Sequence, residues 1–426
     1  MTTAVPQAGG AGYRAAFAVR EFRPVFAAHL VSVIGLVVAE LALTVLVYRL
    51  TGSPLMSALT FALGFLPYVL GGTLLAGLAD RHPARRVLVA CDLVCAACAA
   101  AMVLPGTPVA ALLVLRCAMA FVAPLFQGTR NASLADILGS GPVFVLGRSL
   151  LRVVAQSAQL VGFGLGGLLL TVLAPRAALA LTAAAFLGSA ALLRFGTRNR
   201  PARAAGDRTS PLAGARAVLG DRRLRALTLM FWVPSFFLIA AEALMVPYAE
   251  HVGAGTVALG LLMCAMPVGA VAGELWAGSA LGPAARSRIA RPLAAVSLLP
   301  LLAYAGRPGV PVLLGVLLVA GLAHAYTLGL DQWYVAAVPE DLRGRAMTLL
   351  SSGLMTLQGA GMAVAGLAAE YLPVHGVVAG AGALGTLSVL VLLGELRRTG
   401  ADDASAAAGA APRERGPKDE TGLTTI

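Results

Sequence analysis

The sequence predicts an all-α membrane protein with twelve transmembrane helices, arranged as two pseudo-symmetric halves of six helices. Of its 426 residues, 58% are apolar and only 12% are charged, whereas soluble domains are about 45–50% apolar and about 25% charged. A water-soluble fold has too little interior to hide this excess of apolar residues. Two further observations support the prediction, namely a one-sided distribution of basic residues and an internal repeat.

Each predicted helix is an apolar run close to the roughly 20 residues that are needed to cross a bilayer. Turn-forming residues separate the runs, for example at 51–54 and 105–108. In chain order the runs are 25–48, 55–79, 87–104, 108–130, 150–174, 177–195, 226–249, 255–280, 289–305, 310–333, 347–372 and 376–396. The first run is long and lacks a small-residue cleavage site, so we expect no cleavable signal peptide.

The longest polar stretch divides the chain into two halves. A basic linker, 196–225, joins an N-terminal six-helix half, 25–195, to a C-terminal six-helix half, 226–396. Residues 1–24 form a short N-terminal segment. The tail, 397–426, is rich in Ala, Gly and charge, a composition typical of disorder. We expect the linker and both terminal segments to lie in the cytoplasm.

The distribution of basic residues predicts this orientation. A net charge of +12 would suggest nucleic-acid binding in a soluble protein, but in membrane proteins basic residues mark cytoplasmic loops. With the N-terminus inside, 28 of the 32 basic residues fall on the cytoplasmic side, three fall outside, and Arg116 lies within a helix. We therefore expect a multi-pass protein of a bacterial cytoplasmic membrane, in contact with the lipid bilayer and with no nucleic acid.

The two halves also repeat in sequence. Part of the fifth predicted helix aligns with part of the eleventh at a shift of 199, which pairs Gln159 with Gln358. The first predicted helix is similar to the seventh at a shift of 202, which pairs Glu40 with Glu242. Parallel six-helix repeats are the architecture of one large class of secondary transporters.

The loop between the second and third predicted helices carries a charged motif, AGLADRHPARRVLVACDLV. It resembles the G-x-L-A-D-R-x-G-R-R signature of the major facilitator superfamily. The matching charged residues are Asp80, Arg81, Arg85 and Arg86. The spacing is one residue longer, and alanine replaces the first glycine. The resemblance covers residues 22–396 and implies two halves that rock around a central cavity, exposing one site alternately to each side.

This charged motif has two interpretations. Asp80 lies at a helix end, from which it could pair with arginines across the boundary between the halves and lock the inner side shut. Alternatively, the arginines are only a topology signal. Glu274 is predicted near the inner end of the eighth helix, at the same level, and is interpreted as a gating residue.

Three further stretches resemble a branch of small-molecule exporters that includes siderophore and macrolide efflux proteins. They are LVYRLTGSPL at 46–55, LADILGSGPVFVLGRSL at 134–150 and VPEDLRGRAM at 338–347. Two positions depart from the pattern, because Phe163 replaces the proline of the antiporter motif and Leu36 replaces an acid. The resemblance implies a monomer that exports a small amphipathic molecule (a drug, antibiotic or siderophore-like compound) in exchange for protons.

Ionisable residues within the predicted membrane segments are candidate site residues, because a charge at the bilayer centre costs at least about 2.5–3.5 kcal/mol. Glu40 and Glu242 lie at similar depths in paired helices, where either could carry the coupling proton or face a cationic substrate. Each could instead be hydrogen-bonded to a neighbouring helix for packing. Arg116 could pair with Glu40 or Glu242, or bind an anionic substrate group, and a structural ion pair is equally consistent with the sequence.

The resemblance places further polar candidates on helices that line the cavity. Gln156, Gln159 and Gln358 could contact the substrate or form interhelical hydrogen bonds. His324, predicted in the middle of the tenth helix, can titrate near neutral pH but could equally serve packing.

Other functional classes find little support in the sequence. Three cysteines, Cys91, Cys95 and Cys98, share one helix face, and small-residue packing is favoured over a metal site because few other ligand types are near. A phosphate-binding loop is excluded because Lys418 is the only lysine. We predict no cofactor, no metal and no enzymatic activity. Two alternatives remain open, an importer of the same fold and a non-transporting membrane sensor or assembly factor.

Overall fold

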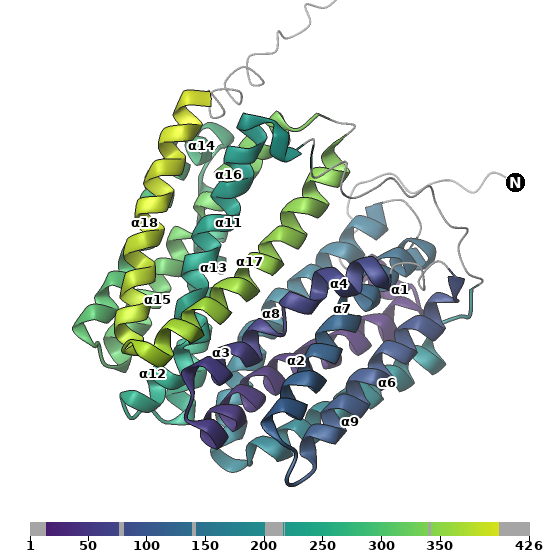
Figure 1. Ribbon diagram of the computed structural model, residues 1–426. Coiled ribbons are helices and arrows are strands. Elements are labelled where there is room, and N and C mark those ends of the chain that lie inside the picture. The colour runs from purple at the N-terminus through teal and green to yellow at the C-terminus, as the bar shows by residue number, and fades with distance from the viewer. Residues whose placement is uncertain are drawn as a thin grey trace, which may run out of the picture.

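The computed structural model describes residues 14–75, 81–138, 142–200, 216, 218–339 and 342–399. Within these ranges the chain is almost entirely helical and contains no β-strand. Figure 1 shows two helical bundles side by side, one from each half of the sequence. The prediction of an all-α protein is therefore confirmed.

The first bundle comes from the N-terminal half. Its described helices are α1 (Arg14–Ala18), α2 (Phe22–Thr51), α3 (Pro54–Ala62), α4 (Leu66–Leu74), α6 (Ala84–Val103), α7 (Val109–Leu138), α8 (Pro142–Val172) and α9 (Pro175–Gly196). Within this bundle α2 packs against α8 and α9, while α6 contacts both α7 and α9.

The second bundle comes from the C-terminal half. Its described helices are α11 (Arg222–Ala243), α12 (Met245–His251), α13 (Thr256–Ala280), α14 (Pro283–Val296), the 3-10 helix η1 (Leu299–Gly306), α15 (Val310–Ala323), α16 (Tyr326–Ala337), α17 (Arg343–Tyr371) and α18 (Val374–Thr399). Here α11 packs against α17 and α18, and α13 packs against α15.

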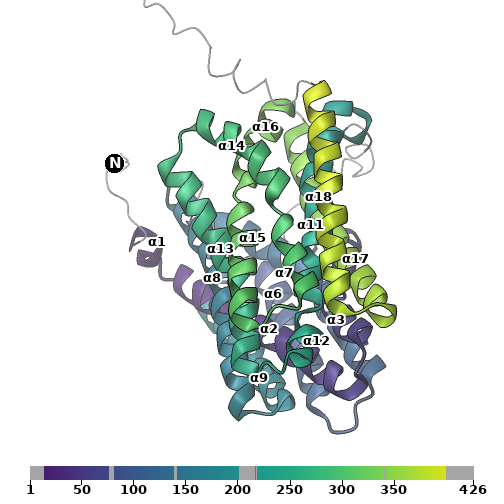
Figure 2. The same cartoon turned by 90° about the vertical axis from the view of Figure 1, so that its left-hand side faces the viewer.

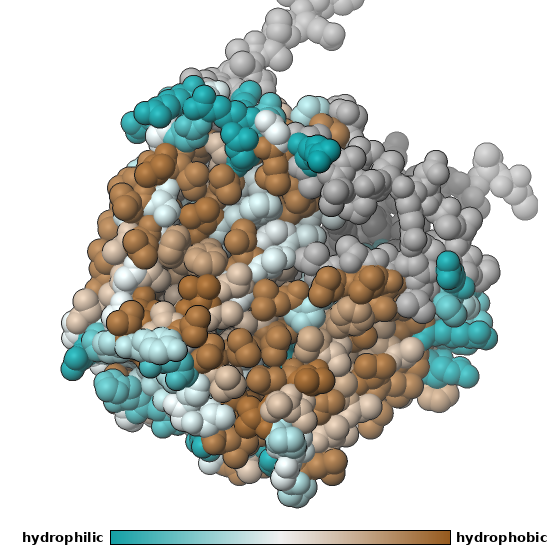
Figure 3. Space-filling model, viewed as in Figure 1, coloured by the Kyte–Doolittle hydropathy of each residue, from teal (hydrophilic) through white to brown (hydrophobic). Residues whose placement is uncertain are grey.

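The surface of the molecule fits a bilayer. Eleven segments of the described chain are long and apolar enough to cross a membrane, and α8 supplies a shorter apolar stretch, Ser157–Val172, where a further span is predicted. Large apolar side chains point outward, including Phe195 at 84% and Leu74 at 69% exposure. Figure 3 shows apolar residues across most of one face, with hydrophilic residues gathered at its ends. The chain is therefore a multi-pass membrane protein.

Four predicted helices are interrupted. The breaks fall between α3 and α4, α11 and α12, α14 and η1, and α15 and α16. Pro67, Pro247 and Pro300 lie in the first turns after three of the breaks, where a missing N–H is tolerated that a continuous helix would need. The fourth break, at His324 and Ala325, has no proline.

The two halves meet along two seams that repeat the sequence symmetry. In the first seam α8 packs against α13, and in the second α3 and α4 pack against α17. A Cβ atom added to Gly167 would lie 2.7 Å from the Cα of Gly260, and one added to Gly366 would lie 2.6 Å from the Cβ of Ala58. The shifts of 199 and 202 relate Gly167 to Gly366 and Ala58 to Gly260, so the internal repeat is also present in the packing.

Contacts between the halves gather toward one end of the molecule. There α2 ends at Thr51, α3 begins, and α17 ends at Tyr371, and we call this the closed end. Figure 2 shows α3 and α12 near each other at this end. From it the helices of the two halves diverge toward the opposite end, which carries the starts of α2 and α11 (Figure 1).

Candidate functional site

An ion pair within the membrane segments links α2 to α7. Arg116 Nη2 lies 2.5 Å from Glu40 Oε1, and the two side chains are only 6% and 15% exposed. Glu40 is the nineteenth residue of α2, about 27 Å along the helix axis at 1.5 Å per residue, so the pair is far from either end of the span. The structure thus selects Glu40 over Glu242 as the partner of Arg116.

Gly64, in the break between α3 and α4, makes room for this pair. A Cβ atom at this position would lie 2.1 Å from Arg116 Nη2, a distance that real contacts do not show. The Nε atom of Arg116 is buried and has no hydrogen-bond partner among the described residues. The guanidinium therefore binds one carboxylate, and its Nε–H donor has no partner among the described residues.

Glu242 lies near the end of α11, beside a small pocket in the C-terminal half. The pocket has a cavity volume of about 10 Å³, room for no more than one water molecule, and its other lining residues are Met245, Leu262, Met263, Met266, Pro267 and Leu317. Within the described chain the Glu242 carboxylate has no hydrogen bond or ion pair. The carboxylate of Glu40 acts on it electrostatically. The structure therefore contrasts a paired acid with an unpaired one.

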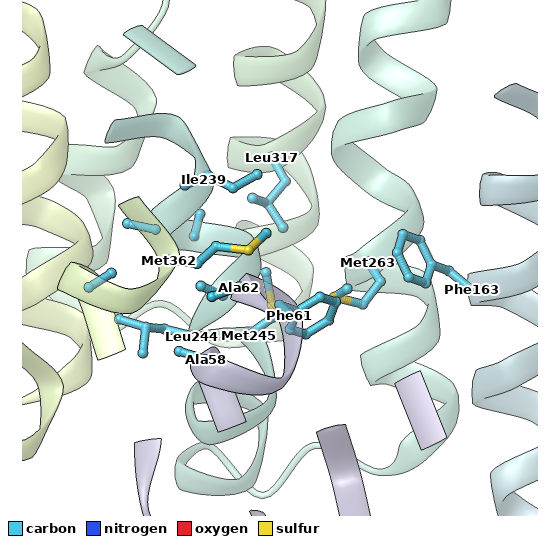
Figure 4. Packing of buried hydrophobic residues seen from close by; sticks show 14 of the residues in the cluster. Ala58, Phe61, Ala62, Phe163, Ile239, Leu244, Met245, Met263, Leu317 and Met362 are labelled. Carbon is cyan, nitrogen blue, oxygen red and sulfur yellow. The ribbon is translucent and has the colours of Figure 1, made fainter. Parts of the chain in front are cut away.

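An apolar cluster joins the halves beside this pocket. Figure 4 shows Phe61 of α3 close to Met245 and Met263 of the C-terminal half, with Phe163 of α8 beyond Met263. Phe61 is fully buried, and Met245 and Met263 are 2% and 4% exposed. Methionine side chains are flexible and polarisable and adapt to apolar partners of varied shape. The unpaired carboxylate thus faces an adaptable, apolar wall.

Comparisons with known proteins agree with this architecture. The sequence profile of the Major Facilitator Superfamily matches residues 25–332. The chain belongs to the major facilitator superfamily. A search of curated proteins found no match.

Solved structures of superfamily-type transporters share the fold. A nucleoside transporter, NupG in a D323A mutant, is 15% identical, with a TM-score of 0.69 over 87% of this chain and 99% of its own. A POT family transporter is 10% identical, with a TM-score of 0.68 over 88% of this chain and 95% of its own. A bacterial homolog of the human lysosomal transporter Spinster, in an inward-facing conformation, is 16% identical, with a TM-score of 0.57 over 94% and 98%. The protein is a membrane transporter of the major facilitator type.

The remaining polar candidates are less closely linked to the acids. Gln159 and Gln358 are partly buried and make no hydrogen bond to a described residue, but each adjoins a residue at a seam. The carbonyl of Leu160 accepts a bond from the Cys264 thiol, 3.1 Å away, and Gly359 packs on Leu66. For Gln156 the structure describes only the helix.

His324 lies at the break between α15 and α16, not inside a continuous helix as predicted. Its ring packs edge-on against the ring of Tyr326, with the centroids 5.6 Å apart. The histidine therefore lies at the interruption of the tenth span.

The described residues include only part of the superfamily signature. Asp80 lies outside the described residues. Arg81 and Arg86 are exposed, and Arg85 donates a 3.2 Å hydrogen bond to the carbonyl of Thr197, at the end of α9 in the same half. Glu274 is partly buried on α13. No ion pair among the described residues joins these signature arginines to the C-terminal half.

The structure also reveals a polar contact that the sequence patterns did not single out. His29 Nε2 lies 3.2 Å from the carbonyl of Leu151, so Nε2–H is the donor and Nδ1 accepts from Arg130. His29 precedes Glu40 by eleven residues, or three helical turns, and so shares its face of α2. That spacing is the only sequence signal for a link between α2, α7 and α8.

A charged contact ties the start of α2 to the chain after α9. Glu21 accepts hydrogen bonds from Arg200 at 2.6 and 2.7 Å and from the backbone N–H of Arg198 at 2.8 Å. Partial burial alone would raise the pKa of Glu21, but these hydrogen bonds and the arginine charges outweigh it and hold the pKa below its ordinary value. The contact fastens the beginning of the basic linker to the first bundle.

Proposed function

We propose that this transporter exports a small amphipathic organic molecule across a bacterial cytoplasmic membrane in exchange for protons. The observation that carries the proposal is the contrast between two acids in paired helices, Glu40 with an arginine counter-ion and Glu242 without one. An isolated carboxylate in a medium of low dielectric constant costs free energy that a proton or a cationic ligand removes. Glu242 is therefore the proposed exchange site.

The ion pair gives Glu40 a different role. Arg116 is a permanent cation whose Nη2 lies 2.5 Å from Glu40 Oε1, so Glu40 already has a counter-ion whereas Glu242 has none among the described residues. A conformational change that lengthened the Glu40–Arg116 distance would alter the field at Glu242 and couple proton release to movement of the halves.

The surroundings of Glu242 indicate the class of substrate. Three methionines, two leucines and a proline surround Glu242, a lining whose chemistry suits a molecule with an apolar part and one polar or cationic group. The cavity is smaller than such a molecule, so we propose that these flexible side chains move apart when the substrate binds. Gln159 and Gln358, which have no hydrogen-bond partner in the described chain, are proposed to contact the polar part. Polar groups that fix orientation are few in such sites.

The orientation predicted from the basic residues assigns the diverging end to the cytoplasm and the closed end to the outside. In this orientation the structure is an inward-facing state. The exposure of Arg81 and Arg86 and the bond of Arg85 within its own half are the arrangement expected when the proposed inner lock, with Asp80 and Glu274, is not engaged.

Transport in vesicles tests the proton role. A ligand-stabilisation screen across antibiotic and siderophore classes supplies a substrate, whose movement is then followed in proteoliposomes under an imposed pH gradient. We expect Glu242→Gln to abolish proton-driven flux while leaving substrate counterflow measurable. Glu250→Gln, which removes an exposed carboxylate in the same half, is the matched control. Normal proton-driven flux in Glu242→Gln, Glu40→Gln and the double variant would exclude this role.

The same vesicles test the direction of transport. With the protein inserted in one known orientation, an exporter accumulates substrate on the periplasmic side when protons enter the cytoplasmic side. Accumulation on the cytoplasmic side together with protons would instead establish the importer alternative.

A further inference from the structure

A charged side chain forms a polar contact between the halves at the closed end. Glu370, in the last turn of α17, accepts hydrogen bonds from the hydroxyl of Ser53 and from the backbone N–H of Leu55, which lies 3.1 Å away. Ser53 and Leu55 belong to the N-terminal half and Glu370 to the C-terminal half. They are more than 300 residues apart in the chain.

Glu370 completes the cap of α3, whose first four positions leave backbone N–H groups without an intrahelical partner. Ser53 N–H bonds to the Thr51 hydroxyl oxygen at 3.2 Å, Pro54 has no N–H, and Met56 N–H bonds to the Ser53 hydroxyl oxygen at 3.1 Å. The remaining N–H, that of Leu55, is satisfied by Glu370. The N-terminus of this helix is therefore fully capped only while the other half is in contact with it.

The charge of Glu370 adds to this interaction. Aligned peptide dipoles place about half a positive charge at a helix N-terminus, where a carboxylate is stabilising. If the halves separate at the closed end, the carboxylate, the Ser53 hydroxyl and the Leu55 N–H must all exchange this contact for water. Separation of the halves at this end would therefore break the contact.

The symmetry-related seam has no equivalent contact. The shift of 199 relates Glu370 to Thr171, whose hydroxyl bonds to Leu168 within its own helix at 2.6 Å. The shift of 202 relates Ser53 to Gly255, which has no side chain to cap α13. The first seam is held by the backbone approach at Gly167 and Gly260 and by the bond from the Cys264 thiol to the Leu160 carbonyl, whereas the second seam carries a charged contact at Glu370.

We propose that Glu370 is the gate residue of the closed end, a positioning residue that holds the two halves together there by capping α3 from across the second seam. The proposal goes beyond proton exchange and requires only that the halves move relative to each other. Removing the carboxylate favours the conformation that is open at this end. The effect is modest because Glu370 is exposed, and we expect about a three- to tenfold change in the ratio of open to closed molecules.

Distance measurements between spin labels test the gate without a known substrate. Val172 and Val257 lie at the closed end on opposite sides of the first seam and are 78% and 47% exposed. Labels attached after Val172→Cys and Val257→Cys, in a background without the five native cysteines, report on opening and do not lie at the second seam. Pulsed electron resonance on the full chain in lipid nanodiscs gives the fraction of molecules with a long distance.

Glu370→Ala should increase the long-distance fraction, and Glu370→Gln, which keeps an acceptor but loses the charge, should give an intermediate value. Ser53→Ala should also increase it, and its effect should add less than fully to that of Glu370→Ala because both remove one contact. Glu250→Gln, which neutralises another exposed acid near the same end, should leave the distribution unchanged. Melting temperatures confirm that the variants are folded.

Unchanged distances in both Glu370 variants would overturn the proposal, as would an equal shift in Glu250→Gln, which would indicate a general effect of surface charge. Failure of proton-driven flux in Glu242→Gln does not bear on these distances. The gate and the exchange site are therefore tested separately.

Discussion

The buried ion pair predicts an unequal response to loss of its two members. We consider Glu40→Met and Arg116→Met, which replace each partner with an apolar side chain of similar length. Removing one partner of a buried pair typically costs about 3–5 kcal/mol because the other charge remains uncompensated. At 15% and 6% exposure, neither side chain has enough contact with water to avoid that cost.

The two remaining groups differ in their chemistry. In Glu40→Met the guanidinium cannot lose its proton, so the full cost of about 3–5 kcal/mol is expected. In Arg116→Met the carboxyl of Glu40 can take up a proton and remain as a neutral acid, and an unsatisfied neutral polar group costs about 1–3 kcal/mol. Glu40→Met should therefore be the more destabilising, although it removes the shorter side chain.

Thermal unfolding in detergent, followed by tryptophan fluorescence between pH 5.5 and 8.5, measures this difference. Arg116→Met should become less stable as the pH rises, because its neutral state depends on a bound proton, whereas Glu40→Met should show no such trend relative to wild type. The double variant should be more stable than Glu40→Met, because no charge is left unpaired. Equal destabilisation by the two single variants, with the same pH dependence, would refute this account of the pair.

The described contacts predict the effects of three further substitutions on stability. Gly64→Ala should lower the unfolding temperature and cost about 1–3 kcal/mol by displacing the guanidinium beside it, whereas Gly72→Ala, where the added Cβ would meet its nearest neighbour at 3.5 Å, should be tolerated. Ser189→Ala should cost about 1–3 kcal/mol, because its buried hydroxyl donates a 2.6 Å bond to the buried Asp92; equal stability to wild type in denaturant would contradict this. Glu21→Gln should reduce stability at pH 7 by less than about 1 kcal/mol. Because the folded state lowers the pKa of Glu21 below its ordinary 4.5, the difference in melting temperature should be fully present above pH 4.5 and should shrink as the pH falls below it, and a difference that does not shrink in acid would argue against the assignment.

Much of the fold was predictable because it depends on composition and periodicity. Apolar length predicts the spans, and the repeat predicts which helices are equivalent, as the packing of Gly167 and Gly366 confirms. Prolines 67, 247 and 300 offered a signal for three of the helix breaks. The break at His324 could not be predicted, because it carries no proline and an apolar run reads the same whether the helix is straight or bent.

The sequence identified the residues of the candidate site but not the contacts between them. Depth in the membrane identified Glu40, Glu242 and Arg116, but the choice of partner depends on the relative axial positions of three helices. No pattern within one helix contains that information. The unsatisfied Nε of Arg116 and the role of Gly64 likewise follow from side-chain direction, which a residue's position along a span does not determine.

Glu370 shows a different limit and also connects the site to the movement of the halves. An exposed acid at a helix end is ordinarily a solvated charge, and its importance here comes from a helix terminus supplied by the other half. Because α3 carries both that terminus and Phe61, which packs beside the pocket of Glu242, opening of the second seam would move an apolar wall of the pocket together with the gate. Gly64 follows α3 directly and contacts Arg116, so the same displacement would reach the ion pair. The short helix α3 and the residues that follow it thus contact Glu370, the apolar wall and the charged pair, and this arrangement provides a physical route by which proton exchange at Glu242 and closure at Glu370 could influence each other.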